Sequence, residues 1–314
     1  MCTKTAIATP KEVVPVEQLL DPPSPLARFS CASAMVAVFA VWGKWAFIGN
    51  ENAPGNNNSE MHSAWYPIIL TVVYAVSLPL MRVLTQNYIS KVVDVKLLLR
   101  ETMIIYNGGQ VLLNMLTVWQ IFYAIRYNGH PLYGDLYNVS SGATYAVWIH
   151  YCDKYLEFFD TYFMVLRGKM DQVTFLHVYH HVTIAWAWYL ALCFYPGGDA
   201  YFGALLNSII HVMMYSYYTL ALLKVRCPWK KYLTVAQLTQ FVTVFSFTCY
   251  VFVAMPPEAQ WNHYAAVGIQ LFEMASLFLL FMVFFRKTYR KPDKKKPKTL
   301  DSSSDSDTEQ SVDS

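Results

Sequence analysis

The chain has 314 residues, of which 55% are hydrophobic and only 14% are charged. Soluble domains usually carry about 25% charged residues, so this composition excludes an ordinary soluble domain and indicates an integral membrane protein. The formal net charge of +3 decides little, because the charges gather in a few segments.

Apolar runs long enough to cross a bilayer recur along the chain. A bilayer core needs about 20 mostly apolar residues per helix, and the absence of an alternating pattern favours a helical bundle over a barrel. An eighth run, 31–49, is interrupted by Lys44, and whether it spans the membrane stays open. The remaining runs predict an all-α bundle of seven transmembrane helices, at 65–81, 104–126, 143–165, 172–195, 200–223, 233–254 and 262–285.

Basic residues indicate how this bundle is oriented. Lys and Arg collect on the cytosolic side of short loops, and here they gather in 82–100, 166–171, 224–231 and after Phe285. The alternate connections contain few basic residues, so the C-terminus is predicted to be cytosolic. Asn57 and Asn138 lie in glycosylation patterns on the predicted lumenal side, which leaves open whether either is modified.

Three segments follow from these patterns. Residues 1–60 form an N-terminal segment with the extra apolar run, 61–288 the transmembrane domain, and 289–314 a tail. The tail is first basic, then acidic and Ser-rich in "DSSSDSDTEQSVDS", a composition that predicts disorder. The six cysteines form no CxxC pair, so buried thiols are expected.

Polar residues inside transmembrane helices are costly and usually face a cavity or the bundle interior. In the third predicted span, His150, Lys154, Glu157 and Thr161 share a helical face, with Asp160 at its edge. Lys154 and Glu157 neutralise one another at i,i+3. A structural ion pair that only ties helices together is the alternative interpretation of that pair.

The next spans continue the polar pattern. His177, His180 and His181 stand on one face of the fourth span, and imidazole ligates metals, shuttles protons or attacks acyl groups. The fifth span carries a stripe of Asn207, His211, Met214, Tyr215 and Tyr218. Polar residues that either catalyse or merely hold helices together occur in the sixth and seventh spans, namely Thr234, Gln237, Gln240, Gln270 and Glu273.

Three kinds of chemistry compete for these residues. "HVYHH" has the form of a histidine box of membrane di-iron desaturases and hydroxylases, but the chain has only eight histidines and no second such box. Three of them, His62, His130 and His263, fall on the predicted lumenal side, so no metal site is predicted. A transporter would need fewer acid–base groups. Acyl transfer on a lipid-like substrate entering from the cytosolic half fits the pattern better.

Four motifs occur together and in order. They are "KYLEFFDT" (Lys154, Glu157, Asp160, Thr161), "HVYHH" (His177, His180, His181), "HVMMYSYY" (His211, Met214, Tyr215, Tyr217, Tyr218) and "TVAQLTQ" (Thr234, Gln237, Gln240). Through them the chain resembles the ELO family of very-long-chain fatty acid elongases over residues 60–290. The first 60 residues and the last 20 fall outside the resemblance.

The resemblance implies a multi-pass 3-oxoacyl-CoA synthase of the endoplasmic reticulum membrane, with six of seven helices around an acyl tunnel. It implies condensation of a long-chain acyl-CoA with malonyl-CoA, releasing CO2 and CoA, without a cofactor. The implied partners are the lipids of that membrane and the reductase, dehydratase and enoyl reductase that complete the cycle. No nucleic-acid partner is expected, and homo-oligomerisation stays open.

The resemblance also suggests roles for residues. His180 is expected to carry the acyl group and His211 to assist it, oriented by Asn207, while His177 and His181 transfer protons or hold the enolate. Lys154 is expected to meet the malonyl carboxylate or a CoA phosphate, with Glu157 and Asp160 orienting the cations. Hydrogen-bonding support is expected from Thr161, Tyr215, Tyr218, Gln237 and Gln240. Which histidine carries the acyl group is open.

Substrate preference is less determined. "FLHVYHH", with Gln172 five residues before the box, resembles the polyunsaturated branch of the family. An elongase acting mainly on saturated or monounsaturated acyl-CoA is the alternative. Cytosolic basic residues are expected to attract CoA, unless they reflect topology alone; they are Arg167, Lys169, Lys224, Arg226, Lys230 and Lys231.

Overall fold

The computed structural model describes residues 20, 22–48, 63–134, 136, 141–195 and 198–289. Every regular element within these ranges is helical. The helices are α1 (Pro25–Gly43), α2 (Trp65–Leu84), α3 (Ser90–Val92), α4 (Val95–Leu98), α5 (Arg100–Tyr127), α6 (Ala143–Leu156), α7 (Phe158–Leu166), α8 (Phe175–Phe194), α9 (Ala200–Leu222), α10 (Leu233–Val253) and α11 (Trp261–Tyr289). The acidic tail and both glycosylation patterns lie outside the described residues.

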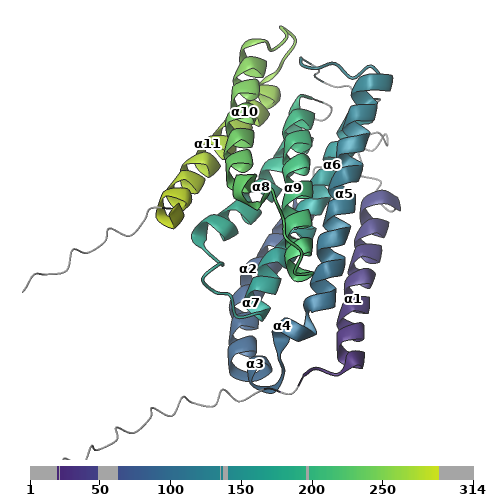
Figure 1. The fold of residues 1–314 in the computed structure, drawn as a ribbon. Coiled ribbons are helices and arrows are strands. Elements are labelled where there is room, and N and C mark those ends of the chain that lie inside the picture. The colour runs from purple at the N-terminus through teal and green to yellow at the C-terminus, as the bar shows by residue number, and fades with distance from the viewer. Residues whose placement is uncertain are drawn as a thin grey trace, which may run out of the picture.

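The long helices run side by side as a bundle (Figure 1). The start of α1 and the α3–α4 corner lie at one end of it. The cytosolic orientation of the basic segments stays a prediction. Each predicted span except 143–165 coincides with one helix to within a few residues. The chain is therefore an all-α, multi-pass membrane protein, and segments long and apolar enough to cross a bilayer include Pro25–Ile48, Trp65–Val92, Lys230–Val253 and Trp261–Arg286.

The apolar run 31–49, left open by the sequence, is part of a continuous helix. Ser24 caps its start, accepting a hydrogen bond from Ala27 N at 3.1 Å, and Pro25 occupies the first turn. A π-helical turn, Lys44–Ile48, extends α1. Lys44 therefore does not end the helix, and the whole segment has the length and hydropathy of a membrane span.

Two predicted segments differ in detail. The expected loop 82–100 contains the π-helical turn Thr85–Ile89 and the short helices α3 and α4, because Asp94 caps α4 through Lys96 N at 2.9 Å. The expected continuous span 143–165 is broken at Glu157, where Asp160 N donates to Glu157 O at 3.0 Å over three residues. The break separates α6 from α7.

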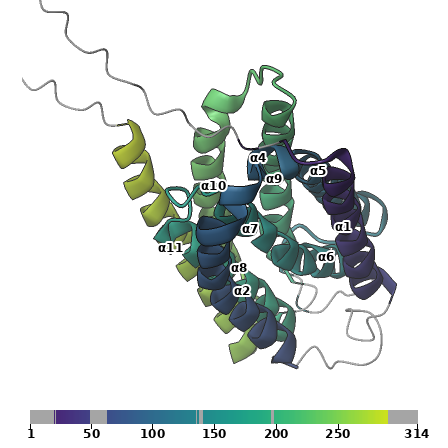
Figure 2. The same ribbon diagram turned by 90° about the horizontal axis from the view of Figure 1, so that it is seen from below.

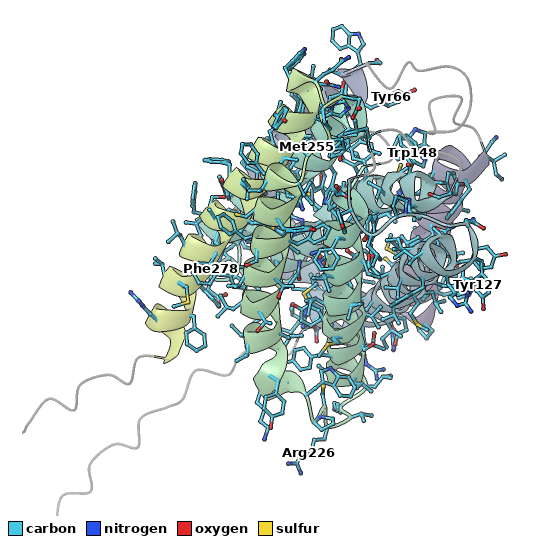
Figure 3. The ribbon with its side chains drawn as sticks, turned by 90° about the horizontal axis from the view of Figure 1, so that it is seen from above. Tyr66, Tyr127, Trp148, Arg226, Met255 and Phe278 are labelled. Carbon is cyan, nitrogen blue, oxygen red and sulfur yellow. The ribbon has the colours of Figure 1, made fainter. Side chains whose placement is uncertain are left out.

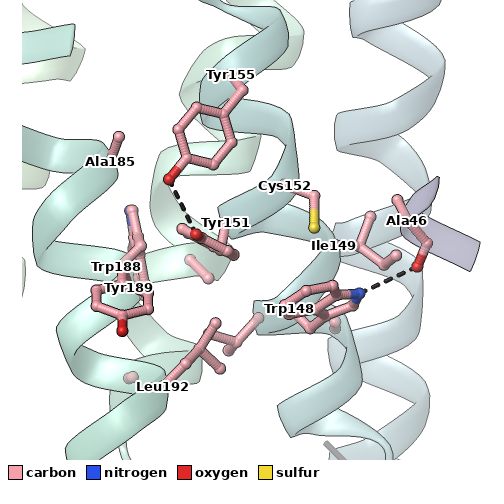
Figure 4. Close-up of a cluster of buried hydrophobic side chains, with 14 of the residues drawn as sticks. Ala46, Trp148, Ile149, Tyr151, Cys152, Tyr155, Ala185, Trp188, Tyr189 and Leu192 are labelled. Atoms are coloured by element: carbon pink, nitrogen blue, oxygen red, sulfur yellow. Dashed lines mark hydrogen bonds between the residues drawn. The ribbon is translucent and has the colours of Figure 1, made fainter. Parts of the chain in front are cut away.

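Helix α1 is fastened to α6 by two indole hydrogen bonds. Trp42 Nε1 donates to Cys152 O at 2.9 Å. Trp148 Nε1 donates to Ala46 O at 3.0 Å (Figure 4). Cys152 lies in the apolar cluster around this contact. The same side of the bundle holds α1, α5 and α6, while α10 and α11 lie across from them (Figure 2).

The outside of the bundle is apolar. Large side chains with more than half of their surface exposed include Val73, Trp119 and Phe272, on α2, α5 and α11. Exposed apolar side chains on separate helices suit contact with lipid rather than water. Arg226 and Met255 mark opposite ends of α10 (Figure 3), so the basic loop before α10 lies at the far end of the helix from the loop that follows it.

Candidate functional site

The three clustered histidines occupy the first two turns of α8. Thr174 caps the helix by accepting from His177 N at 3.2 Å, which fixes where the helical spacing begins. The ring centroids of His177 and His181 are 4.5 Å apart, and those of His180 and His181 are 5.4 Å apart. The helix thus presents three imidazoles as one group, as the spacing predicts.

A buried ion pair lies in the same core. Lys154 Nζ is 2.5 Å from Glu157 Oε1, and each side chain is only 1% exposed. From α9, Asn207 Oδ1 accepts from Lys154 Nζ at 3.1 Å, while His211 Nδ1 lies 3.1 Å from the same Glu157 oxygen. The His211 ring is at ion-pair distance but is not aligned for a hydrogen bond to that carboxylate. Lys154 and Glu157 thus meet Asn207 and His211 of α9 in the interior of the bundle.

The residues after the α6–α7 break bind other helices. Thr161 Oγ1 is 2.9 Å from His177 Nε2 and 2.7 Å from the hydroxyl of Tyr74 on α2. Tyr215 of α9 donates to Asp160 Oδ2 at 2.7 Å. Both motif residues of α7 thus hold groups on neighbouring helices in place, and Thr161 links the histidines of α8 to α2.

A cavity lies beside this site. It lies between α8, α9, α10 and α11, and most of its lining is apolar. His180 is the member of the "HVYHH" triplet that lines it, and Asn207 and Gln240 line it with His180. A chain of methylene groups fits such a lining, while His180 and Asn207 supply polar atoms at its wall. The lining residues come from four helices, so the expected six-helix enclosure stays a prediction.

The other predicted supporting residues lie at the edge of this site. Gln237 Nε2 is 4.0 Å from Met214 Sδ, which links α10 to α9 but is a weak contact. Tyr218 is 36% exposed, and its ring meets Tyr215 edge-on at 6.1 Å. Their direct participation is therefore supported less strongly by geometry than that of Gln240.

Several polar residues of the site were not among those selected from the sequence. Asn114 Nδ2 of α5 donates to Asp153 Oδ2 at 3.4 Å, and both residues are 1% exposed. Ser208 of α9 was not selected either, and its Oγ lies 3.1 Å from Nδ1 of His150, a residue that the sequence did place on the polar face. Asp153 stands one helical turn before Glu157, and this i,i+4 spacing was the available signal.

Two further features bear on ligands. In the described part of the chain, no three His, Cys, Asp or Glu side chains converge in the arrangement of a metal site. In the basic loop before α10, Lys230 and Lys231 lie over the rings of Tyr217 and Tyr232 at 5.3 and 4.8 Å. Both lysines are exposed at the surface.

Fold and site together define a multi-pass helical membrane protein with clustered imidazoles and a buried Lys–Glu pair beside an apolar cavity. The sequence pattern of the ELO (GNS1/SUR4) family matches residues 59–297. The chain belongs to this family.

Curated relatives share the same central region. The chain is 38% identical over 212 residues to very long chain fatty acid elongase 4 of Homo sapiens, covering 64% of this chain and 65% of the relative. It is 36% identical over 200 residues to very long chain fatty acid elongase 5 of Xenopus tropicalis, covering 61% and 66%. Fatty acid elongase 5 of Leishmania major is 39% identical over 203 residues, covering 63% and 77%. The match thus spans about two thirds of the vertebrate relatives.

Proposed function

We propose that the protein is a fatty acid elongase, a 3-oxoacyl-CoA synthase that condenses a long-chain acyl-CoA with malonyl-CoA. The observation that carries the proposal is the position of His180, which lines the apolar cavity and belongs to the imidazole group beside Lys154 and Glu157. Family membership supports the same reaction class. The names of the relatives also specify fatty acid elongation.

The reaction proceeds in two acyl transfers. A His180 ring nitrogen attacks the thioester carbonyl, the C–S bond breaks, and CoA leaves as its thiol after taking the imidazole proton. Malonyl-CoA then loses CO2, and the electron pair of the broken C–C bond becomes an enolate. The enolate carbon attacks the acyl-imidazole, giving 3-oxoacyl-CoA and releasing His180, which recovers a proton. One proton from solvent is consumed overall.

Buried neighbours hold the reacting groups. The ammonium of Lys154 is the cation available for the malonyl carboxylate or the enolate oxygen. Glu157 balances that charge and faces His211, so His211 is suited to proton transfer. Asn207 accepts from Lys154 rather than from His211 in this arrangement. We therefore assign Asn207 to positioning Lys154, in place of the orienting role toward His211 predicted from the sequence.

The substrate is a long acyl chain that extends from His180 along α8 into the cavity. We favour polyunsaturated acyl-CoA, supported by the "FLHVYHH" stretch, with saturated or monounsaturated chains as the competing preference. The reaction needs no metal or organic cofactor in this scheme. We place the protein in the endoplasmic reticulum membrane with a cytosolic C-terminus, alongside a reductase, a dehydratase and an enoyl reductase.

The test is condensation by the purified protein in detergent or proteoliposomes. Labelled malonyl-CoA is supplied with a panel of acyl-CoAs, and label is expected in 3-oxoacyl-CoA. With His180→Ala, both product and covalent acyl-protein should fall to background, whereas Tyr217→Phe retains activity. Full condensation by His180→Ala would refute the covalent role. Absence of any labelled product with the wild type would refute elongation, and oxygen-dependent desaturation would favour a di-iron enzyme instead.

A further inference from the structure

Two adjoining chambers lie between α8, α9, α10 and α11. The near chamber contains His180, Asn207 and Gln240 in its lining. The far chamber is lined by residues outside all four sequence motifs, among them Tyr195 and Val251. Three residues line both chambers and mark the junction between them, namely Ala191, Ala266 and Gln270.

Gln270 is the movable part of this junction. Ala191 and Ala266 end at Cβ, so neither side chain changes the width of the passage by rotating. A Cβ added at Gly203 of α9 would lie 3.1 Å from Gln270 Nε2 and 3.4 Å from the ring of Trp188. Because Gly203 has no side chain, the Gln270 amide occupies the space beside it. A methyl group at position 203 would press on that amide.

The end of the far chamber is fixed. Tyr195 donates through its hydroxyl to Asp199 Oδ2 at 3.3 Å, and Gly134 N donates to the same oxygen at 3.0 Å. The Tyr195 ring packs against the backbone at Gly198, and a Cβ added to Gly198 would lie 2.2 Å from the ring. Its hydrogen bond to Asp199, which also accepts from Gly134 N, and this close packing hold Tyr195 in place, whereas Gln270 is the one long side chain at the junction.

The helical rise of α8 gives the acyl-chain lengths that reach the junction and Tyr195. His180 and Ala191 are 11 residues apart on α8, an axial rise of about 16 Å. An extended chain gains about 1.2 Å per bond, so an acyl group on His180 meets the junction after about 14 carbons. Tyr195 lies about 6 Å further along the helix axis, a distance that about 5 more extended carbons span.

We propose that Gln270, seated against Gly203, is a specificity-determining gate between the two chambers. Acyl chains shorter than about 14 carbons end before it, and longer chains pass it to reach the far chamber. The proposal rests on the proposed elongase function and adds the residue that selects chain length. It places selection at a side chain on α11, well away from the reacting histidines.

The experiment compares kcat/KM for acyl-CoAs of about 12 and about 18 carbons, on either side of the calculated junction. Gly203→Ala is expected to lower the long-to-short ratio by about tenfold, because one methyl group in a tight pocket changes selectivity by that order. Gln270→Ala removes the obstruction and is expected to raise the ratio. Gly268→Ala is the matched control on α11, because its added Cβ meets nothing within 4 Å.

The outcomes separate this proposal from the proposed function. Condensation by the wild type with an unchanged length ratio in both Gly203→Ala and Gln270→Ala overturns the gate while leaving the elongase assignment intact. Equal loss for both chain lengths in Gly203→Ala overturns it too, since that pattern reports general damage. Absence of condensation by the wild type on any chain overturns both. Shifts of opposite sign, with Gly268→Ala like the wild type, support the gate.

Discussion

The buried pair of Lys154 and Glu157 permits a quantitative prediction. Lys154→Met leaves the Glu157 carboxylate, 1% exposed, with the His211 imidazole as its remaining nearby partner. Removing one member of a buried ion pair costs about 3–5 kcal/mol, whereas removing both charges is often close to neutral. With about 2–4 °C per kcal/mol for a medium-sized domain, the single variant should lose at least about 6 °C in apparent Tm. The double variant Lys154→Met/Glu157→Gln should recover most of that loss.

The measurement is intrinsic tryptophan fluorescence during heating of the purified protein in detergent. The comparison pair is Arg28 and Glu101, which also form a salt bridge but have side chains 29% and 33% exposed. Arg28→Met should shift the apparent Tm far less, because solvent compensates an exposed partner. The single variant Glu157→Gln completes the cycle. If the double variant loses as much apparent Tm as Lys154→Met and Glu157→Gln added together, Lys154 and Glu157 are not coupled and the reasoning is wrong.

Other predictions concern packing, hydrogen bonding and metal. Gly109→Ala should lower the apparent Tm more than Gly108→Ala does. A Cβ added at position 109 would lie 2.5 Å from the Phe39 ring, whereas one added at position 108 meets nothing within 4 Å. Equal shifts in the two variants would contradict the close contact. Tyr215→Phe removes the 2.7 Å hydrogen bond to Asp160 and should cost about 1–3 kcal/mol of stability, measured by thermal unfolding; an unchanged melting curve would speak against it. Condensation should continue after dialysis against a chelator, and loss restored by one metal would argue for a metal site.

The sequence predicted most of the helices well because a membrane-spanning helix is recognised from the hydropathy of a whole segment and not from any single residue. It also placed Lys154 with Glu157, and Asn207 with His211, on common helical faces, because residues three or four apart lie on the same side of a helix. It did not identify Asp153 with Asn114 or Thr161 with Tyr74, because these pairs depend on which helices are neighbours. Spacing alone also assigned Asn207 to His211, one turn away, whereas Asn207 Oδ1 accepts a hydrogen bond from Lys154 Nζ on another helix.

The break at Glu157 shows why site and fold depend on each other here. Backbone polar groups inside a bilayer need internal partners, and an interrupted helix leaves carbonyl groups unbonded. At this break Tyr106 of α5 donates to Leu156 O at 3.3 Å, and its ring meets Tyr215 edge-on at 5.9 Å. The residue that satisfies the break thus also packs against the tyrosine that binds Asp160. A tyrosine outside every motif therefore supports both the shape of the helix and the position of an acidic group in the site.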